Sequence, residues 1–361
     1  APAPAGAEAA AEAAAEERRR VALACPVCQQ PFGAGAAGGA AVCKRCDLAF
    51  PRERVGNFQD LTIEAARLPS ELVGAGSQPS EPAEEEEEGG LLQRLPFVGT
   101  TDAIAGMLGL PQSKEVEALV RDVVREGGPF RPRAGQQLGT STFQSPVVTF
   151  AYERGWRQSF ASSGFPGVEE EFKLAQTFLA ETSEAGQGVL LDASCGSGLF
   201  SRRFASSGAY GSVVALDFSA SMLRQVDSFA KKELGRDYAA PPELGGRALS
   251  LVRADIGRLP FPSDALDGVH ASAAIHCWPA PANAVAEIAR VLKPGGVLVM
   301  STFTPRSPMA AAGSGSGNAP YRFWSRDELQ SLTRRCGLVD FEAIERQPAF
   351  IMVRVRKPRA D

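Results

Sequence analysis

The strongest constraint on the fold is a run of small residues that follows an apolar strand pattern. Residues 188–193 read Gly-Val-Leu-Leu-Asp-Ala, and the loop 194–198 then carries two glycines before a helical pattern begins. A backbone that turns sharply at the end of a strand passes close to a ligand, so small residues are required there. Twenty-five residues after Asp192, the next strand pattern ends in Asp217, whose carboxylate can accept hydrogen bonds from both hydroxyls of a ribose. This order of strand, loop, helix and acid predicts a nucleotide-type site.

Strand and helix patterns alternate from residue 188 to the end of the chain. Such alternation predicts an α/β fold, a doubly wound and mostly parallel sheet. Five parallel strands are expected, followed by an antiparallel pair: 188–193, 212–217, 249–254, 268–273, 296–303, then 339–345 with 349–356. The expected sheet is therefore seven-stranded and Rossmann-like.

Four of the seven cysteines form one cluster near the N-terminus. Cys25 and Cys28, then Cys43 and Cys46, give the spacing C-x2-C-x14-C-x2-C. Each pair can turn two thiolates toward one ion, and two pairs complete a tetrahedral site, so the spacing predicts a small structural zinc ribbon. Four thiolates leave no open position for catalysis. The alternative is a set of free thiols.

Composition divides the chain into five parts. We expect a disordered tail at 1–20, the ribbon at 21–62, a linker with an acidic run at 63–98, a helical insertion at 99–140, and the α/β domain with an N-terminal helical lid at 141–361. Tyr152, Trp156 and Arg157 would form one side of that lid; the alternative is core packing by the aromatic residues with Arg157 on the surface. The tail is acidic and lacks a signal pattern, so we expect any transit peptide to have been removed.

The charge and hydropathy of the chain limit the classes of partner that it can bind. The formal net charge is −4, which excludes a generally basic nucleic-acid coater. No apolar run approaches the roughly 18 residues of a membrane span, although peripheral association with lipid bodies stays open. Between Arg18 and Val55, seven basic residues face two acidic ones, which fits either an RNA contact or a solvated surface.

The first loop favours a cofactor without phosphates. A dinucleotide loop has a third glycine where this chain has Ser201, and Asp192 would repel a pyrophosphate. A ligand with a positive amino group suits that acid better, and S-adenosylmethionine (SAM) is such a ligand.

Three further segments carry a family resemblance. Residues 252–262, 266–271 and 290–298, together with the first loop, resemble class I SAM-dependent methyltransferases, and the likeness covers about 169–357. It implies that Asp192, Gly196 and Gly198 hold the methionine part, with Ser194 where the family usually has glycine. It further implies that Asp217 holds the ribose and that the adenine is bounded by the following residues: Phe218, Met222, Asp255 and Ile256.

A narrower resemblance concerns localisation. Residues 150–158, 164–167, 192–201 and 276–279 look like a plant and algal chloroplast methyltransferase group with an N-terminal cysteine ribbon. It implies a chloroplast location, with plastoglobules as one site. The domain order is also similar to bacterial 23S rRNA guanine-N1 methyltransferases, whose ribbon helps hold RNA.

The acceptor is expected beyond the fourth parallel strand. His276 is the candidate base or substrate contact, and Trp278 can stack on a planar acceptor. His270 is expected to be a satisfied core residue. The 290–296 region resembles quinone-type methyltransferases, which implies a small lipophilic acceptor. The alternatives are an RNA methyltransferase that docks through its ribbon and a SAM-binding scaffold without turnover.

Overall fold

The computed structural model describes residues 22–32, 40–67, 160–161, 164–182, 187–240, 246–307, 321–346 and 348–359. The expected tail, the helical insertion, most of the linker and the lid residues Tyr152, Trp156 and Arg157 lie outside these ranges. In the described part of the chain, no helix has the length and apolarity that a membrane span would need.

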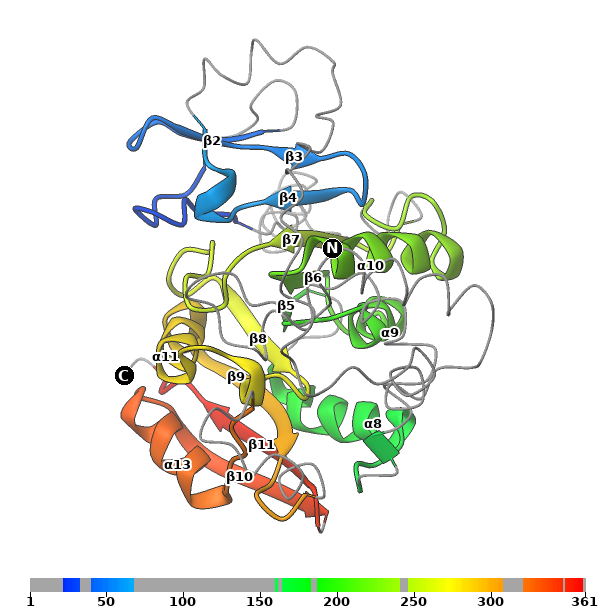
Figure 1. Cartoon of the computed structure of the whole chain (residues 1–361), viewed down its shortest axis with the longest axis vertical. Coiled ribbons are helices and arrows are strands. Elements are labelled where there is room, and N and C mark those ends of the chain that lie inside the picture. The colour runs from blue at the N-terminus through cyan, green and yellow to red at the C-terminus, as the bar shows by residue number, and fades with distance from the viewer. Residues whose placement is uncertain are drawn as a thin grey trace, which may run out of the picture.

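All seven expected strands are present: β5 (Val189–Ala193), β6 (Ser212–Asp217), β7 (Leu249–Arg253), β8 (Leu266–Ala271), β9 (Leu292–Phe303), β10 (Val339–Arg346) and β11 (Phe350–Arg356). They lie in the order β10-β11-β9-β8-β5-β6-β7 (Figure 1). The five strands from β9 to β7 are parallel, whereas β11 is antiparallel to both of its neighbours. The expected doubly wound sheet is therefore confirmed.

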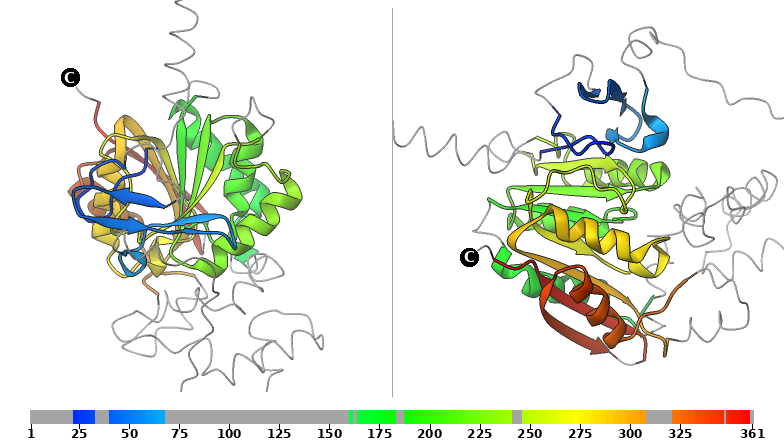
Figure 2. Two further views of the ribbon diagram at one scale, coloured as in Figure 1. Left: turned by 90° about the horizontal axis from the view of Figure 1, so that it is seen from above. Right: turned by 90° about the vertical axis from the view of Figure 1, so that its left-hand side faces the viewer.

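Helices cover both faces of this sheet, as Figure 2 shows. One face carries α8 (Val168–Leu179), α9 (Leu199–Ser207) and α10 (Ala220–Glu233), and the other carries α11 (Pro281–Val291) and α13 (Arg326–Arg335). The sequence explains local boundaries: Ser325 and Glu328 form a capping box at the start of α13, and Ser219 caps α10. Two apolar clusters result, one on each face.

The cysteine segment extends the sheet instead of standing apart from it. β1 (Ala41–Cys43) pairs with β2 (Leu48–Phe50), and the hairpin of β3 (Arg52–Glu53) and β4 (Phe58–Asp60) follows. β4 then runs parallel to β7, so the sheet has nine strands and not seven. The sequence did not indicate these two strands because they are two and three residues long, too short for an alternating pattern to show. The strand β4 is moreover held by a partner about 190 residues away in the chain.

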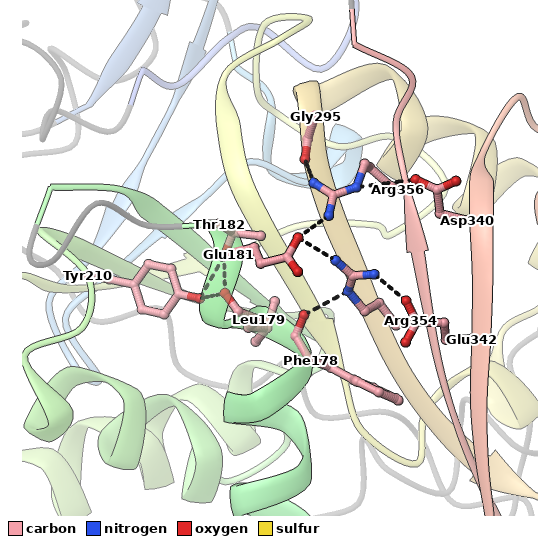
Figure 3. A network of polar contacts seen from close by, with 10 residues as sticks. All are labelled: Phe178, Leu179, Glu181, Thr182, Tyr210, Gly295, Asp340, Glu342, Arg354 and Arg356. Atoms are coloured by element: carbon pink, nitrogen blue, oxygen red, sulfur yellow. Dashed lines mark hydrogen bonds and ion pairs between the residues drawn. The ribbon is translucent and has the colours of Figure 1, made fainter.

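A polar network closes the end of the sheet opposite the glycine loop (Figure 3). Arg354 on β11 donates to Glu181 at 2.9 Å and to Glu342 at 2.6 Å, while Arg356 donates to Glu181 and to the carbonyl oxygen of Gly295 at 2.9 Å. Both guanidinium groups are buried and therefore need these partners. The arginines in turn lower the pKa of Glu181. Because the network ties the turn that follows α8 to strands β10 and β11, we interpret it as structural.

Candidate functional site

The glycine loop lies against the end of β6. Ser194 and Gly196 both have φ of 56°, the left-handed region, so the chain reverses direction within a few residues. The Cys195 N–H donates to the Leu216 carbonyl oxygen at 3.0 Å, and the Gly196 N–H donates to Asp217 at 2.8 Å. The structure thus brings together the loop and the acid, which the sequence predicts from separate segments.

Asp217 is held by backbone donors on both carboxylate oxygens. One oxygen accepts the Gly196 N–H and the other accepts the Ser219 N–H, both at 2.8 Å. Burial, with a smaller effect from the nearby negative charge of Asp192, raises the pKa of Asp217 to about 6, although the backbone donors lower it. The carboxylate is oriented, half-buried and still has lone pairs for two hydroxyl donors, as ribose binding requires.

Asp192 lies beneath the loop and contacts protein groups. Its two oxygens accept hydrogen bonds from the Ser201 hydroxyl and from His270 Nδ1, the latter at 2.8 Å. Asp192 and His270 are both buried, and the His270 ring packs against Phe200 and Phe204. The structure therefore assigns Asp192 to holding the loop in place. Direct contact with a methionine amino group stays a prediction. His270 is buried with Nδ1 paired, although its Nε2 atom has no hydrogen-bond partner.

Gly198 and Met222 have packing roles in the structure. Gly198 has φ of 77°, and a Cβ atom added there would lie 2.7 Å from a Val226 methyl group on α10. Met222 is buried, and its N–H donates to Ser219 Oγ at 3.3 Å. The family resemblance implies that both residues contact the cofactor, whereas the geometry shows that the glycine lets α9 and α10 pack closely. A ligand contact for either residue stays a prediction.

The side of the site on which adenine is expected is formed by the loops after β6 and β7. Asp255 is exposed, with one oxygen accepting the Gly257 N–H at 2.8 Å, and the neighbouring Ile256 is buried. Arg253 donates through Nε to the Phe218 carbonyl oxygen at 2.9 Å and lies 5.4 Å from the centre of the Phe218 ring. Arg253 was not among the residues predicted from the sequence, because an arginine at the end of a strand carries no signal of its own.

The expected acceptor side is buried and aromatic. His276 lies in a 3-10 turn, η5 (Ile275–Cys277), and packs edge-on against Phe303 and Tyr321. Its Nδ1 atom is 3.4 Å from the Thr302 hydroxyl, and burial lowers its pKa to about 4. His276 is therefore neutral at neutral pH. A neutral imidazole with this pKa is a weak base, so the geometry favours a hydrogen-bonding or shape role over proton abstraction.

Trp278 connects the expected acceptor side to the glycine loop. Its indole N–H donates to Ser194 Oγ at 3.0 Å, and its ring is buried. The departure from the family's usual glycine thus has a structural use, because Ser194 provides the acceptor for this bond. Ser194 adopts the left-handed backbone conformation, which glycine would adopt with less strain.

A buried carboxylate near the same strand ends was not anticipated. Glu171 on α8 accepts hydrogen bonds from the hydroxyls of Ser272 at 2.5 Å and Ser301 at 2.8 Å. Ser301 also accepts the Ala273 N–H, which fixes the chain as it leaves β8. In the sequence, Glu171 is the third of three consecutive glutamates at a helix start. Acidic residues are common there because they interact favourably with the helix dipole, so Glu171 carried no separate signal.

The four predicted cysteine ligands converge. The sulfur atoms of Cys25, Cys28, Cys43 and Cys46 all lie within 4.8 Å of one another. The residue after each second cysteine, Gln29 or Asp47, has positive φ, so each pair lies on a tight turn. Backbone donation from Gln30 lowers the pKa of Cys28 to about 7. Four converging sulfurs in tight turns fit a tetrahedral zinc ion.

Comparisons with known proteins agree with this geometry. Residues 191–300 match the family model described as a methyltransferase domain. The chain contains a class I methyltransferase domain. An uncharacterised chloroplastic methyltransferase of Arabidopsis thaliana is 48% identical over 225 residues, which are 61% of each chain. A second one from the same plant is 43% identical over 249 residues, 66% of each chain.

A more distant relative carries a named reaction. The demethylmenaquinone methyltransferase of Clavibacter sepedonicus is 36% identical over 148 residues, which are 41% of this chain and 54% of the relative. The matched segments cover 61% and 66% of the two Arabidopsis relatives and about half of the bacterial one. The predicted resemblance to class I methyltransferases is confirmed.

Proposed function

We propose that the protein is a chloroplast enzyme that transfers a methyl group from SAM to a small lipophilic, quinone-type acceptor. The observation that carries the SAM assignment is the junction of the glycine loop with Asp217, where two backbone N–H groups orient a half-buried carboxylate. The chloroplast assignment rests on the two Arabidopsis relatives, whose names carry that location. Association with plastoglobules is the part of the proposal that cell fractionation would test.

The chain's own residues would bind and orient the cofactor. Asp217 would accept the ribose hydroxyls, and the turn of Ser194 and Gly196 would bring backbone close to the methionine part. Phe218, Asp255 and Ile256 would bound the adenine. When bound, SAM supplies a methyl group already activated by its sulfonium, so the protein's task is alignment and exclusion of water.

The acceptor side supports a lipophilic molecule. His276 is neutral and is surrounded by Phe303, Tyr321 and the Thr302 hydroxyl. Aromatic and uncharged walls suit a planar apolar acceptor better than a phosphate-rich one. Distant relatives named for demethylmenaquinone and for ubiquinone and menaquinone biosynthesis favour a quinone-type ring within that class.

The four cysteines would hold a structural zinc ion. All four sulfurs would be ligands, so the ion would have no open position for a substrate or an activated water. Its role would be to fold the ribbon, whose described part has short strands and little core of its own.

RNA is the second candidate acceptor, and one observation favours it. Lys44, Arg45 and Arg54 of the ribbon are exposed, as a phosphate-binding surface requires. Against it, β4 is separated from β8 by β7, β6 and β5, so the ribbon lies at the far end of the sheet from His276. A large RNA would have to span that distance. The third hypothesis, a SAM-binding scaffold, predicts cofactor binding without any methyl product.

One experiment separates the three. The full chain is incubated with SAM labelled in the methyl group and a chloroplast extract, and the products are divided into RNA and organic-solvent fractions. Label in the organic phase supports the proposal. RNase-sensitive label makes the protein an RNA enzyme, and absence of label from both fractions despite measurable SAM binding supports the scaffold. The Asp217→Ala variant is the control, since it should lose SAM binding in every case.

A further inference from the structure

The cysteine ribbon is joined to the strand that precedes the adenine loop. β4 pairs with β7 in parallel register, Gln59 with Val252 and Asp60 with Arg253. The pairing continues one residue further, where the Leu61 N–H donates to the Arg253 carbonyl oxygen at 2.8 Å. The ribbon therefore fixes the backbone of β7 at the end from which the cofactor-binding loop departs.

A series of side-chain contacts starts at the same pair of residues, Asp60 and Arg253. Asp60 accepts a hydrogen bond from Arg253 Nη1 at 2.8 Å, and Arg253 Nε donates to the Phe218 carbonyl oxygen at 2.9 Å. Asp60 is itself oriented by the Thr62 hydroxyl at 2.7 Å and the Thr62 N–H at 3.1 Å. Phe218 directly follows Asp217, so the guanidinium connects a ribbon carboxylate to the backbone of the ribose-binding loop.

This ion pair is more sheltered than a surface pair. The side chains of Arg253 and Asp60 are 20% and 13% exposed. A surface pair contributes little because water screens it and both chains are free to move. Here each partner is fixed by a second hydrogen bond, and the planar guanidinium serves two acceptors at once.

The ribbon also packs against the loop after β7. The Ala24 N–H donates to the Pro260 carbonyl oxygen at 2.8 Å. Phe50 and Leu61 of the ribbon belong to the same apolar cluster as Ile256 and Leu259, which follow the exposed Asp255. Both loops assigned to the adenosine part thus contact the ribbon, one through Arg253 and one directly.

We propose that the ribbon is a working part of the cofactor site, in which Asp60 acts through Arg253 as a positioning residue for the Phe218 loop. The inference rests on the proposed SAM site. Without Asp60, the guanidinium loses one of its two acceptors, and the loop that begins at Phe218, directly after Asp217, is held less firmly. The expected result is weaker binding of any ligand that shares the adenosine part, since the contact lies on that side of the site.

The test measures affinity for SAM and for S-adenosylhomocysteine by calorimetry on the full chain. Asp60→Asn should raise both dissociation constants by roughly tenfold, the ratio expected when about 1.4 kcal/mol of binding energy is lost. Arg253→Lys should do the same, because an ammonium cannot reproduce the two-acceptor geometry of a guanidinium. Glu64→Gln is the matched control, since it removes an exposed carboxylate four residues away and should change neither constant.

The double variant tests the route of the effect. If Asp60 acts through Arg253, then Asp60→Asn should have little further effect on an Arg253→Lys background. Each variant is compared at a temperature where circular dichroism shows it fully folded, so a purely structural role would leave the affinity of the folded protein unchanged. That unchanged affinity, in either single variant, overturns the inference. A wild-type chain that binds neither ligand overturns the proposed SAM site itself, and the two failures are therefore distinguishable.

Discussion

Gly198 offers a direct test of whether a glycine in the first loop serves the ligand or the packing. Its φ of 77° is the left-handed region, and an added Cβ would meet the Val226 methyl groups at 2.7 Å and 2.9 Å. Gly198→Ala should therefore be destabilising for two separate reasons, a strained backbone and a steric overlap. Gly208, at the end of α9, has φ of 67° and nothing within 4 Å of its added Cβ. It provides a matched control with the strain but without the overlap.

The two contributions have different expected sizes. Placing an alanine in the left-handed region costs about 1–2 kcal/mol, which both variants share. Forcing an extra methyl group into a packed helix interface costs about 1–3 kcal/mol, which only Gly198→Ala incurs. The free energy of unfolding should thus fall by about 1–2 kcal/mol in Gly208→Ala and by about 2–5 kcal/mol in Gly198→Ala. Urea denaturation followed by circular dichroism measures both.

A double-mutant cycle with Val226→Ala identifies the cause. Removing the Val226 methyl groups makes room for the new Cβ, so the double variant should be more stable than the sum of the single effects predicts, with a coupling of about 1–3 kcal/mol. It should also bind SAM as Val226→Ala alone does. If Gly198→Ala loses SAM affinity and the double variant regains stability but not that affinity, the packing interpretation is refuted and Gly198 contacts the ligand.

Four further predictions concern the site. Asp217, with its pKa raised to about 6, should lose its charge as the pH falls through 6. SAM affinity should therefore decline below that pH in the wild type, whereas it should be weak and pH-independent in Asp217→Asn. Calorimetry from pH 5 to 8 checks both expectations. His276 has a pKa of about 4 in the folded chain against about 6.5 unfolded, so its stabilising effect is present above pH 6.5 and is lost as the pH falls toward 4. The wild type should lose about 3 kcal/mol more than His276→Gln over that interval in urea titrations, and parallel curves would contradict the assignment. Trp278→Phe removes the N–H on Ser194 and should cost about 1 kcal/mol of stability while raising the KM for SAM; Ser194→Ala should add little to that variant. Cys43→Ser should abolish binding of the zinc ion proposed for the four cysteines, measured by atomic emission. It should also lower the melting temperature of the α/β domain, because Cys43 shares a core with sheet residues; a domain that melts unchanged would show that the ribbon folds separately.

Much of the fold was predictable because its signals are local. The apolar strand patterns, the glycine loop and the acid of Asp217 each lie within a few consecutive residues, and the alternation of strand and helix patterns predicts a doubly wound, mostly parallel sheet. The strands expected at 212–217 and 249–254 match β6 and β7 to within one residue. The cysteine spacing similarly predicts a convergence that involves only neighbouring turns.

Contacts between distant segments were not predictable. Neither Arg253 nor Glu171 has a local signal, because an arginine at the end of a strand and a glutamate in the first turn of a helix are common in proteins of every function. The resemblance implies that the loop residues form one cofactor site, but it could not show that Asp192 accepts hydrogen bonds from Ser201 and His270. That arrangement depends on side chains from three elements meeting beneath the loop.

The position of the ribbon solves a general problem of open sheets, the exposed edge strand. β7 would be an edge strand without β4, and an exposed edge presents unpaired backbone groups to other chains. The ribbon covers that edge with β4, whose outer neighbour β3 is only two residues long. In β3, Arg52 is exposed and Glu53 is half-buried, so the final edge is short and charged, which discourages pairing with further strands. Since β7 also leads into the loop expected to bind adenine, a module that covers this edge is well placed to fix the proposed cofactor site as well.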